Sequence, residues 1–351
     1  MRRIAQTAFF MATITFGGNA FAAGFELGER TLDPLFEEGG YAEISTFSVD
    51  VSVSGTAAGF PTGDVGDDFF TGSLALKNDL SSELSYALII DQPFARDLTY
   101  GVGPFAGTEA HLSSLAVTGY LRYKFENRVS VHAGLRAQWL DGVLSDPTTR
   151  IRFSDDWGFG YSLGVAYEIP EIALRASLTY DSAIKTEHNT RFNGASVPGL
   201  TNTSIETPQS VNLKFQTGVR EDTLVFGGIR WTDWDQVTLD PGNGGGPDQF
   251  GFRDGLTYTI GVAHVLNDRW TGFAVAEFER KTNLPASSPI DVDDNSRALT
   301  LGAQYVAGNA TITGSITYVD LYDRNGSIGG APVSFSDNNA VALGLKVGWS
   351  F

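Results

Sequence analysis

NAVALGLKVGWSF, the stretch from Asn339 to Phe351, has the pattern that decides the fold of this chain. Large apolar side chains fall on every second position: Val341, Leu343, Leu345, Val347, Trp349 and Phe351. The positions between them hold alanine, glycine, lysine and serine. Because successive side chains of a strand point to opposite sides, a period of two predicts a β-strand with two different faces. One face suits lipid, and the other suits water or a polar lumen.

The same alternation recurs along most of the chain. It is clear in the stretches Phe47–Val53, Leu84–Ile90 and Trp157–Tyr167, where we expect the large apolar side chains to face lipid. From Tyr41 to the end we find no sustained apolar period of 3.6 residues, so helices are not expected to build the fold. The sequence therefore predicts an all-β protein.

The links between the predicted strands alternate strictly between short and long. The short links are Asn78–Ser82, Glu126–Arg128, Glu168–Glu171, Arg220–Asp222, Asn267–Arg269 and Gly308–Asn309. The long links are Gly55–Asp68, Asp91–Thr108, Asp141–Asp155, Ser182–Thr207, Asp235–Asp254, Lys281–Ser296 and Asp320–Asp337. Together they join about 14 strands, and such alternation is typical of an outer-membrane barrel with short periplasmic turns and long extracellular loops. We therefore predict a transmembrane antiparallel β-barrel over residues 41–351, with both of its ends on the periplasmic side.

The N-terminal residues have the pattern of a secretory signal peptide. Arg2 and Arg3 precede an apolar run, and Ala20-Phe21-Ala22 provides the small-residue cleavage site. The run is too short and too interrupted to cross a bilayer as a helix, which needs roughly 18 apolar residues. We expect residues 1–22 to be removed on export to the bacterial outer membrane, so that the short segment 23–40 precedes the barrel.

Composition excludes several classes of function. The chain has no cysteine and a formal net charge of −17, so neither disulfides nor a nucleic-acid surface is expected. The four histidines are scattered, and the aspartate clusters at 64–68 and 291–294 lack the spacing of a calcium loop. We therefore predict no metal site, no cofactor and no nucleic-acid partner.

The chain has no recognisable catalytic constellation. A G-x-S-x-G match surrounds Ser162, but it lies inside a period-two run and not at the strand-to-helix turn that exposes a nucleophile. The glycine-rich residues 242–246 lie in a long link without the context of a phosphate-binding loop. We therefore predict that the protein is not an enzyme and that Ser162 is a small side chain facing the lumen.

Tryptophan and tyrosine residues, Trp231 and Trp234 among them, concentrate near the ends of the predicted strands. An outer-membrane barrel places its interfacial girdles there, whereas a secreted β-sandwich or propeller, the alternative folds, would bury such residues in a core. The last strand ends with Trp349 and Phe351, an aromatic ending of the kind read by the barrel-assembly machinery. We therefore expect that machinery, outer-membrane lipid and lipopolysaccharide as partners.

Several segments together resemble the FadL-type family of long-chain fatty acid and aromatic hydrocarbon transporters. They are YDSAIK (180–185), TPQSVNLKF (207–215), IRWTDWDQV (229–237), NLPASSPIDVDDNSRALTLGAQY (283–305), DQPF (91–94) and WGFGYSLGVAYEIP (157–170). They cover most of the predicted barrel in the same order. The resemblance implies a monomeric 14-stranded barrel with an N-terminal plug, a hydrophobic capture site among the external loops, and energy-independent passage inward.

Two features depart from that family's pattern. Only Ala23–Gly40 precedes the barrel, and this short plug lacks the family's Asn-Pro-Ala motif. Fully extended, it reaches at most about 60 Å, which can thread a band roughly 25 Å tall but cannot form a bulky plug. The family also has a kinked third strand that opens the wall sideways. The third strand predicted here starts at Glu83 and ends before Pro93, so it offers no such opening.

Candidate ligand-binding residues come from the long links. Phe60 in the first link, and Phe94, Tyr100 and Phe105 in the second, are placed to form an apolar capture site outside the membrane. Each ring buried against a ligand would contribute about 1.5–3 kcal/mol. The alternative is that these rings pack the loops against one another.

Candidate gate residues lie in the N-terminal segment. Phe25, Leu27, Leu35 and Phe36 stand among acidic residues, and we expect them to meet the ligand inside the lumen. A barrel of this size is wide enough for solute yet easily blocked by a short segment. The alternative is a periplasmic tail without a gating role.

The leading prediction is a passive channel for hydrophobic small molecules, with long-chain fatty acids or aromatic hydrocarbons as ligands. A general diffusion porin is the main alternative, because the shortened plug would leave more of the lumen open. A surface adhesin is the other alternative, in which the long acidic loops act and the lumen does not.

Overall fold

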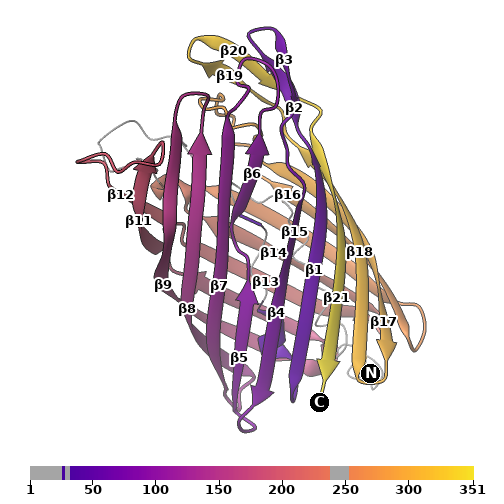
Figure 1. Ribbon diagram of the computed structural model, residues 1–351. Helices are drawn as coiled ribbons and strands as arrows, with labels where there is room; N and C mark the ends of the chain where they lie inside the picture. The colour runs from indigo at the N-terminus through magenta and orange to yellow at the C-terminus, as the bar shows by residue number, and fades with distance from the viewer. Residues whose placement is uncertain (1–25, 28–31, 238–252) are drawn as a thin grey trace.

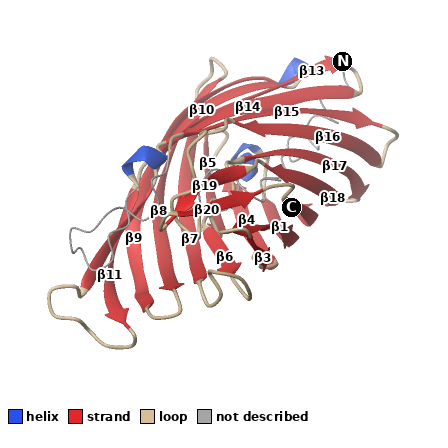
Figure 2. Cartoon of the chain, turned by 90° about the horizontal axis from the view of Figure 1, so that it is seen from above, coloured by secondary structure: helices blue, strands red, loops and turns tan. Residues whose placement is uncertain are grey.

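A computed structural model describes residues 26–27, 32–237 and 253–351. Within this part of the chain the wall is a closed barrel of 14 antiparallel strands, seen from the side in Figure 1 and from above in Figure 2. β1 (Tyr41–Ser52) closes the barrel by pairing with β21 (Asn339–Ser350) along its whole length. The predicted fold class is therefore confirmed. The predicted signal peptide, residues 1–22, lies outside the described residues.

The wall follows the chain order from β1 to β21. Its uninterrupted strands are β4 (Phe69–Asp79), β7 (Glu109–Lys124), β8 (Val129–Ser145), β9 (Arg150–Ile169), β14 (Thr223–Thr232), β15 (Gly255–Val265), β16 (Trp270–Glu279), β17 (Ser296–Ala307) and β18 (Ala310–Leu321). The remaining wall strands consist of two pieces each: β5 (Leu84–Asp91) with β6 (Ala95–Thr99), β10 (Leu174–Asp181) with β11 (Ile184–Phe192), and β12 (Asn202–Thr207) with β13 (Ser210–Arg220). Pro93 and Pro208 stand at two of these breaks, because proline has no N–H to donate to the ladder.

The two faces predicted for the last strand are confirmed. Leu343, Leu345 and Trp349 are exposed on the outer wall, whereas Lys346 between them is buried in the lumen. The aromatic and aliphatic residues of Trp157–Tyr167 form a similar outward row. Large apolar side chains thus make an outer band around a polar interior, which is the division that a membrane barrel requires.

The prediction that Phe47–Val53 faces lipid is wrong. Val49, Val51 and Val53 are buried inside the barrel, and the serines and aspartate between them are exposed. The extracellular end of the lumen holds a packed apolar cluster, to which residues distant in sequence such as Phe335 contribute. These valines therefore face a dry interior. A period of two reveals two faces but not which of them is buried.

The periplasmic links are short as predicted, but several extracellular links are shorter than predicted; β11 and β12, for example, leave only residues 193–201 of the predicted link Ser182–Thr207. β8 and β9 extend to Ser145 and Arg150, so the link between them is residues 146–149 and not Asp141–Asp155. Two long links contribute a small antiparallel sheet of their own, made of β2 (Ser54–Ala57), β3 (Phe60–Asp64), β19 (Arg324–Ile328) and β20 (Ala331–Phe335). This sheet lies at the extracellular end, opposite the termini of the barrel (Figure 1).

Helical structure in the described residues consists of short 3-10 helices. They are η1 (Asp33–Phe36), η2 (Pro170–Ile172) and η3 (Trp234–Gln236). No helix among the described residues is long and apolar enough to cross a membrane. η2 belongs to a short link, whereas η1 and η3 contribute buried residues to the interior and border the candidate site.

Leu345→Arg tests the assignment of the outer wall to lipid. A charged side chain near the middle of the apolar band should lower the unfolding free energy by about 2–4 kcal/mol. Phe60→Arg is the matched control, because Phe60 is 64% exposed in the extracellular sheet and should change stability by less than about 0.5 kcal/mol. Urea unfolding of both variants in phospholipid vesicles measures the difference. Equal effects at the two positions would contradict the assignment.

Candidate functional site

The N-terminal segment lies inside the lumen. η1 is buried within the barrel, and Leu35 has no exposed surface. Pro34 suits the first turn of a helix, because its missing N–H would have no partner there. Asp33 forms an ion pair with Arg175 of β10 at 3.0 Å. This part of the segment therefore follows the inside of the wall.

Phe36 holds the segment against two cations of the wall. The guanidinium carbons of Arg122 and Arg175 lie 4.4 and 4.5 Å from the centroid of its ring, and His132 meets the ring edge-on at 6.0 Å. A cation over an aromatic face is attracted more strongly where water is excluded. Beside it is an apolar cluster of Leu35, Ala75, Ala87, Ile89, Tyr120 and Ala166. The segment thereby fills part of the periplasmic half of the lumen.

Hydrogen bonds anchor the end of the segment to the rim of the barrel. Lys77 Nζ donates to the Gly39 carbonyl oxygen at 3.0 Å, and the Gly39 N–H donates to Asp79 Oδ2 at 2.7 Å. Gly39 has a φ of 68°, which glycine adopts without strain. Gly40 and Phe351 exchange two backbone hydrogen bonds, so Phe351 has a structural contact at the rim.

Glu37 is a buried acid on the N-terminal segment, next to η1 and apart from the wall strands. Burial raises the pKa of its carboxyl to about 8, although Arg175 and Lys346 act in the opposite direction. Glu37 borders a cavity of about 280 Å³ at the periplasmic end, together with Glu38 and Lys124. At neutral pH most molecules therefore carry a neutral Glu37.

The described residues Glu26 and Leu27 lie farther up the lumen, toward the extracellular side. Glu26 is 2% exposed and forms an ion pair with Arg230 of β14, which also donates to Asn212 Oδ1 at 2.6 Å. The Leu27 N–H donates to the carbonyl oxygen of Pro93 at 2.9 Å. The N-terminal segment therefore contacts both β14 and the third wall strand.

The third wall strand is interrupted, and the prediction of an unbroken strand is wrong. β6 lies within the predicted long link Asp91–Thr108, so part of that link belongs to the wall. Both β5 and β6 pair with β7, and Ser114 of β7 bonds the Phe94 N–H and carbonyl oxygen at 2.9 and 2.7 Å. Pro93 cannot donate to the ladder, which is the physical reason for the break.

The break leaves a gap on the β4 side of the third strand. β4 pairs with β5 over Leu74–Asp79, whereas its extracellular part, Phe69–Ser73, pairs only with β1 in the described portion of the chain. Leu27 borders this gap beside Ala95, around a cavity of about 30 Å³. A side chain of the N-terminal segment thus stands where the wall lacks a paired strand.

An apolar cavity of about 50 Å³ lies next to the break. Its mostly apolar lining includes Phe94, Leu112, Leu140, Phe153, Ile205 and Trp234. Phe94 is 1% exposed, and its ring meets that of Trp234 edge-on with centroids 6.1 Å apart. An apolar lining with a few polar groups at its border is typical of a small-molecule site, although this space holds only part of a ligand, because whole ligand pockets measure about 300–1,000 Å³.

The predicted capture residues do not form one site. Phe94 lines the apolar cavity, whereas Phe60 is exposed in the extracellular sheet. Tyr100 and Phe105 pack edge-to-face with centroids 5.5 Å apart, and the Tyr100 hydroxyl donates to the Pro289 carbonyl oxygen at 2.6 Å. The geometry of Tyr100 and Phe105 matches the alternative in which the rings pack the loops together.

Among the predicted gate residues, Leu27, Leu35 and Phe36 lie in the lumen, and Phe25 lies outside the described residues. Trp234 was predicted for an interfacial girdle, but it is 2% exposed in η3. Its separation of three positions from Trp231 could have indicated this, because residues an odd number of positions apart cannot both point outward from one regular strand. Sequence reasoning also missed the partner of Glu26, since a lone inward arginine has no local signature.

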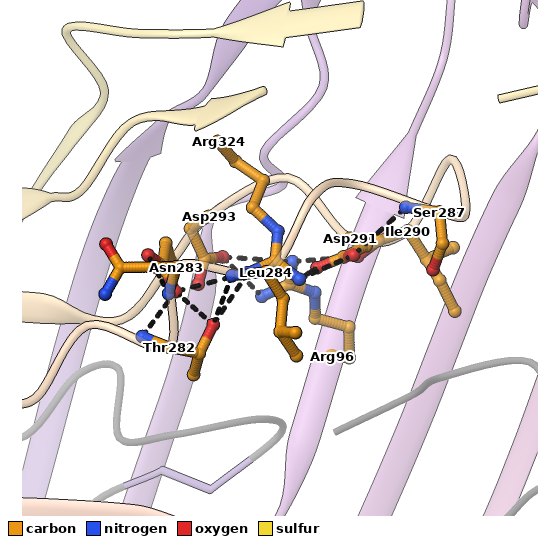
Figure 3. Close-up of polar contacts among 10 residues, drawn as sticks. Arg96, Thr282, Asn283, Leu284, Ser287, Ile290, Asp291, Asp293 and Arg324 are labelled. Atoms are coloured by element: carbon orange, nitrogen blue, oxygen red, sulfur yellow. Dashed lines mark hydrogen bonds and ion pairs between the residues drawn. The ribbon is translucent and has the colours of Figure 1, made fainter. Parts of the chain in front are cut away.

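Ion pairs and hydrogen bonds hold residues 281–294, which we call the strap, against β19 (Figure 3). Arg324 of β19 pairs with Asp291 at 2.7 Å and with Asp294 at 3.2 Å. The Thr282 N–H donates to the same Asp294 carboxylate at 2.8 Å. The two ends of the strap are therefore joined through the Asp294 carboxylate, and Arg324 pairs with that carboxylate from β19.

A second tie joins the strap to the third wall strand just beyond its break. Arg96 of β6 pairs with Asp293 at 3.3 Å and donates to the Ile290 carbonyl oxygen at 3.2 Å (Figure 3). The aspartates of the strap thus bind arginines. Among the described residues no group of three or more potential ligands could hold a metal ion.

The fold and the occupied lumen define a class of protein. An outer apolar band, a polar interior and short links at the end that carries the termini are the architecture of bacterial outer-membrane barrels. Here an N-terminal segment occupies part of the lumen, and a broken wall strand adjoins an apolar cavity. The protein is thus an outer-membrane barrel with part of its N-terminal segment inside the lumen.

Solved structures of this class share the fold. A Pseudomonas aeruginosa FadL homologue has a TM-score of 0.78 at 15% identity, with 95% of this chain and 96% of that chain covered. The Ralstonia pickettii toluene transporter TbuX has a TM-score of 0.66 at 16% identity, with 96% and 98% covered. The architecture is therefore that of FadL-like barrels.

Relatives by sequence are transporters. The chain is 23% identical over 233 residues to the long-chain fatty acid transport protein of Escherichia coli (strain K12). The aligned part covers 59% of this chain and 52% of that protein. The Salmonella typhi protein of the same name is 22% identical over 236 residues. The chain thus spans about half the length of the curated relatives it matches. No protein-family model matches the chain.

Glu37→Gln tests whether the buried acid makes the N-terminal segment sensitive to pH. The pKa of about 8 is raised, so stability is present at low pH and is lost as pH rises through about 8 and the buried carboxyl ionises. Between pH 7 and 9.5, hydrogen exchange of residues 32–40, corrected for its intrinsic rate, should accelerate about tenfold or more in the wild type.

The glutamine variant cannot ionise at this position, so its exchange should change little over the same range. A response of equal size in both proteins would show that another group controls the segment. Exchange is measured by mass spectrometry on the full chain in detergent.

Proposed function

We propose that the protein is a passive outer-membrane channel for hydrophobic small molecules. The observation that carries this proposal is the apolar cavity between Phe94 and Trp234, directly at the break of the third wall strand. It offers an apolar molecule a site with an apolar lining directly beside the gap in the wall. The names of the similar proteins, which specify long-chain fatty acid and toluene transport, support ligands of this kind.

The proposed route leaves the barrel through the gap beside Leu27. η1 and its apolar cluster obstruct the direct path to the periplasm, whereas the gap lies next to the cavity. Moving apolar surface out of water releases about 25 cal/mol per Å², so passage toward the hydrocarbon needs no energy source. Displacement of Leu27 from Pro93 is the step that opens the gap.

Arg230 distinguishes two classes of ligand in this proposal. Its partner Glu26 forms a backbone bridge with Phe94, so the ion pair lies beside a residue that lines the cavity. A ligand carboxylate can replace that of Glu26 while a part of the ligand's chain occupies the cavity. A neutral ligand that displaced Glu26 would remove the ion pair between Glu26 and this buried cation, which is costly. Long-chain fatty acids are therefore favoured over hydrocarbons.

The alternative functions have less support. A general diffusion porin needs an open aqueous lumen, whereas residues of η1 occupy part of it here. An adhesin gives no role to the cavity or to the contacts of the N-terminal segment. Ser162, the centre of the G-x-S-x-G match, is buried inside β9 and far from any strand-to-helix turn, which supports a function without catalysis.

Ile205→Asp tests the cavity. Uptake of labelled oleate and toluene by a strain that depends on this protein should fall about tenfold or more, because a carboxylate in the cavity removes apolar contact and adds a desolvation cost. Asn202→Asp is the matched control, since Asn202 is exposed on the same strand and should leave uptake unchanged. Heat-modifiable gel mobility confirms that both barrels are folded. Equal uptake through the two variants would exclude the cavity as the ligand site.

Glu26→Gln and Arg230→Met test the carboxylate site on purified full-length protein. Removal of the competing Glu26 charge should tighten oleate binding several-fold, whereas loss of Arg230 should weaken it by about tenfold. Oleyl alcohol, which has the same chain without the charge, should respond little to either change. Parallel shifts for both ligands would mean that Glu26 only anchors the N-terminal segment.

A further inference from the structure

Two arginines lie directly opposite each other on the outer surface of the barrel, near its extracellular end. Arg152 of β9 and Arg191 of β11 are partners in the register of these strands, which run side by side at the edge of the barrel in Figure 1. The adjacent residues Phe153 and Thr190 are buried and face inward. Both arginines therefore point outward, and both are exposed.

No direct contact within the described residues neutralises this pair. Neither guanidinium forms an ion pair with a described carboxylate, and Asp141 of β8 acts on Arg152 only at longer range. Arg150, the next outward residue of β9, differs because it pairs with Glu109 at 2.9 Å. Like charges directly opposite each other on neighbouring strands are destabilising, so a bound anion would relieve the repulsion.

The height of the pair places it in the polar region of the membrane. Outward apolar residues run along β9 from Trp157 to Tyr167. At about 3.3 Å per residue and a tilt near 40°, this stretch spans roughly 25 Å, the height of the apolar band. Trp157 and its partner Trp139 on β8 therefore mark the outer edge. Arg152 lies roughly 10 Å beyond, where a long side chain can reach lipid head groups.

We propose that Arg152 and Arg191 bind a phosphate group of lipopolysaccharide in the outer leaflet. Guanidinium groups bind phosphate through paired, charge-assisted hydrogen bonds, and two that face each other can hold one phosphate between them. The chain as a whole has a net charge of −17, so it is repelled by an anionic leaflet. The arginine pair supplies a local attraction at the level of the head groups. This inference is independent of what passes through the barrel.

Arg191→Gln tests the proposal, because the difference in unfolding temperature between the variant and the wild type should change sign when lipopolysaccharide is added. In detergent without lipopolysaccharide the variant should unfold at a higher temperature than the wild type, because the repulsion between the two arginines is gone. With purified lipopolysaccharide present the order should reverse, and the affinity of the variant for it should be about tenfold weaker. If the order of stability is the same with and without lipopolysaccharide, the proposal is wrong.

Arg297→Gln is the matched control, because Arg297 is exposed on β17 but already paired with Asp320 at 2.7 Å. It should leave lipopolysaccharide affinity unchanged, and a loss as large as that of Arg191→Gln would show that total charge, and not this pair, binds the lipid.

Two further probes separate the sources of phosphate. Enzymatically dephosphorylated lipopolysaccharide should bind wild type and Arg191→Gln alike. Inorganic phosphate alone should compete poorly, since it has no acyl chains beside the outer wall. Millimolar phosphate could instead abolish the difference in lipopolysaccharide affinity between the two proteins. The pair would then be a site for free phosphate, and its assignment to the lipid would be overturned.

Discussion

Every backbone N–H and C=O group at the depth of the hydrocarbon needs a partner within the protein, and the rest of this structure depends on that requirement. Pairing of β1 with β21 along their whole length removes the edges of the sheet. Where Pro93 interrupts the ladder, the Ser114 side chain bonds both backbone groups of Phe94, and the Leu27 N–H bonds the Pro93 carbonyl oxygen. The N-terminal segment therefore completes the wall at the point where the strand cannot.

Charges inside the barrel are positioned by partners on other elements. Asp33 pairs with Arg175, and Glu26 pairs with Arg230. Moving both members of a pair out of water is costly, so such pairs contribute little net stability but strongly disfavour any arrangement that leaves one member alone. Their main effect is to determine where the N-terminal segment lies. A ligand that supplies a carboxylate to Arg230 can take the place of Glu26 in this pair and so shift the segment.

The candidate site could be predicted only in part. Phe94 was predicted to bind ligand because it is an aromatic residue of a long link. It lies at the cavity because the wall resumes just after it, at Ala95. Tyr100 and Phe105 had the same sequence character but pack against each other in the apolar cluster at the extracellular end. Trp234 resembled a girdle residue and is buried in η3. Residue type shows that a side chain is apolar, but not which distant link or strand will cover it.

By itself, the sequence determined that the protein is an all-β barrel and which ends of its strands carry short links. These features depend on alternation within single strands and on the residues of single turns, which are local properties. The tertiary structure alone decided that Val51 faces inward, that the third strand has a break, and that Glu26 meets Arg230. Each of these depends on contact between segments far apart in the chain, and such contacts exist only after the barrel has closed.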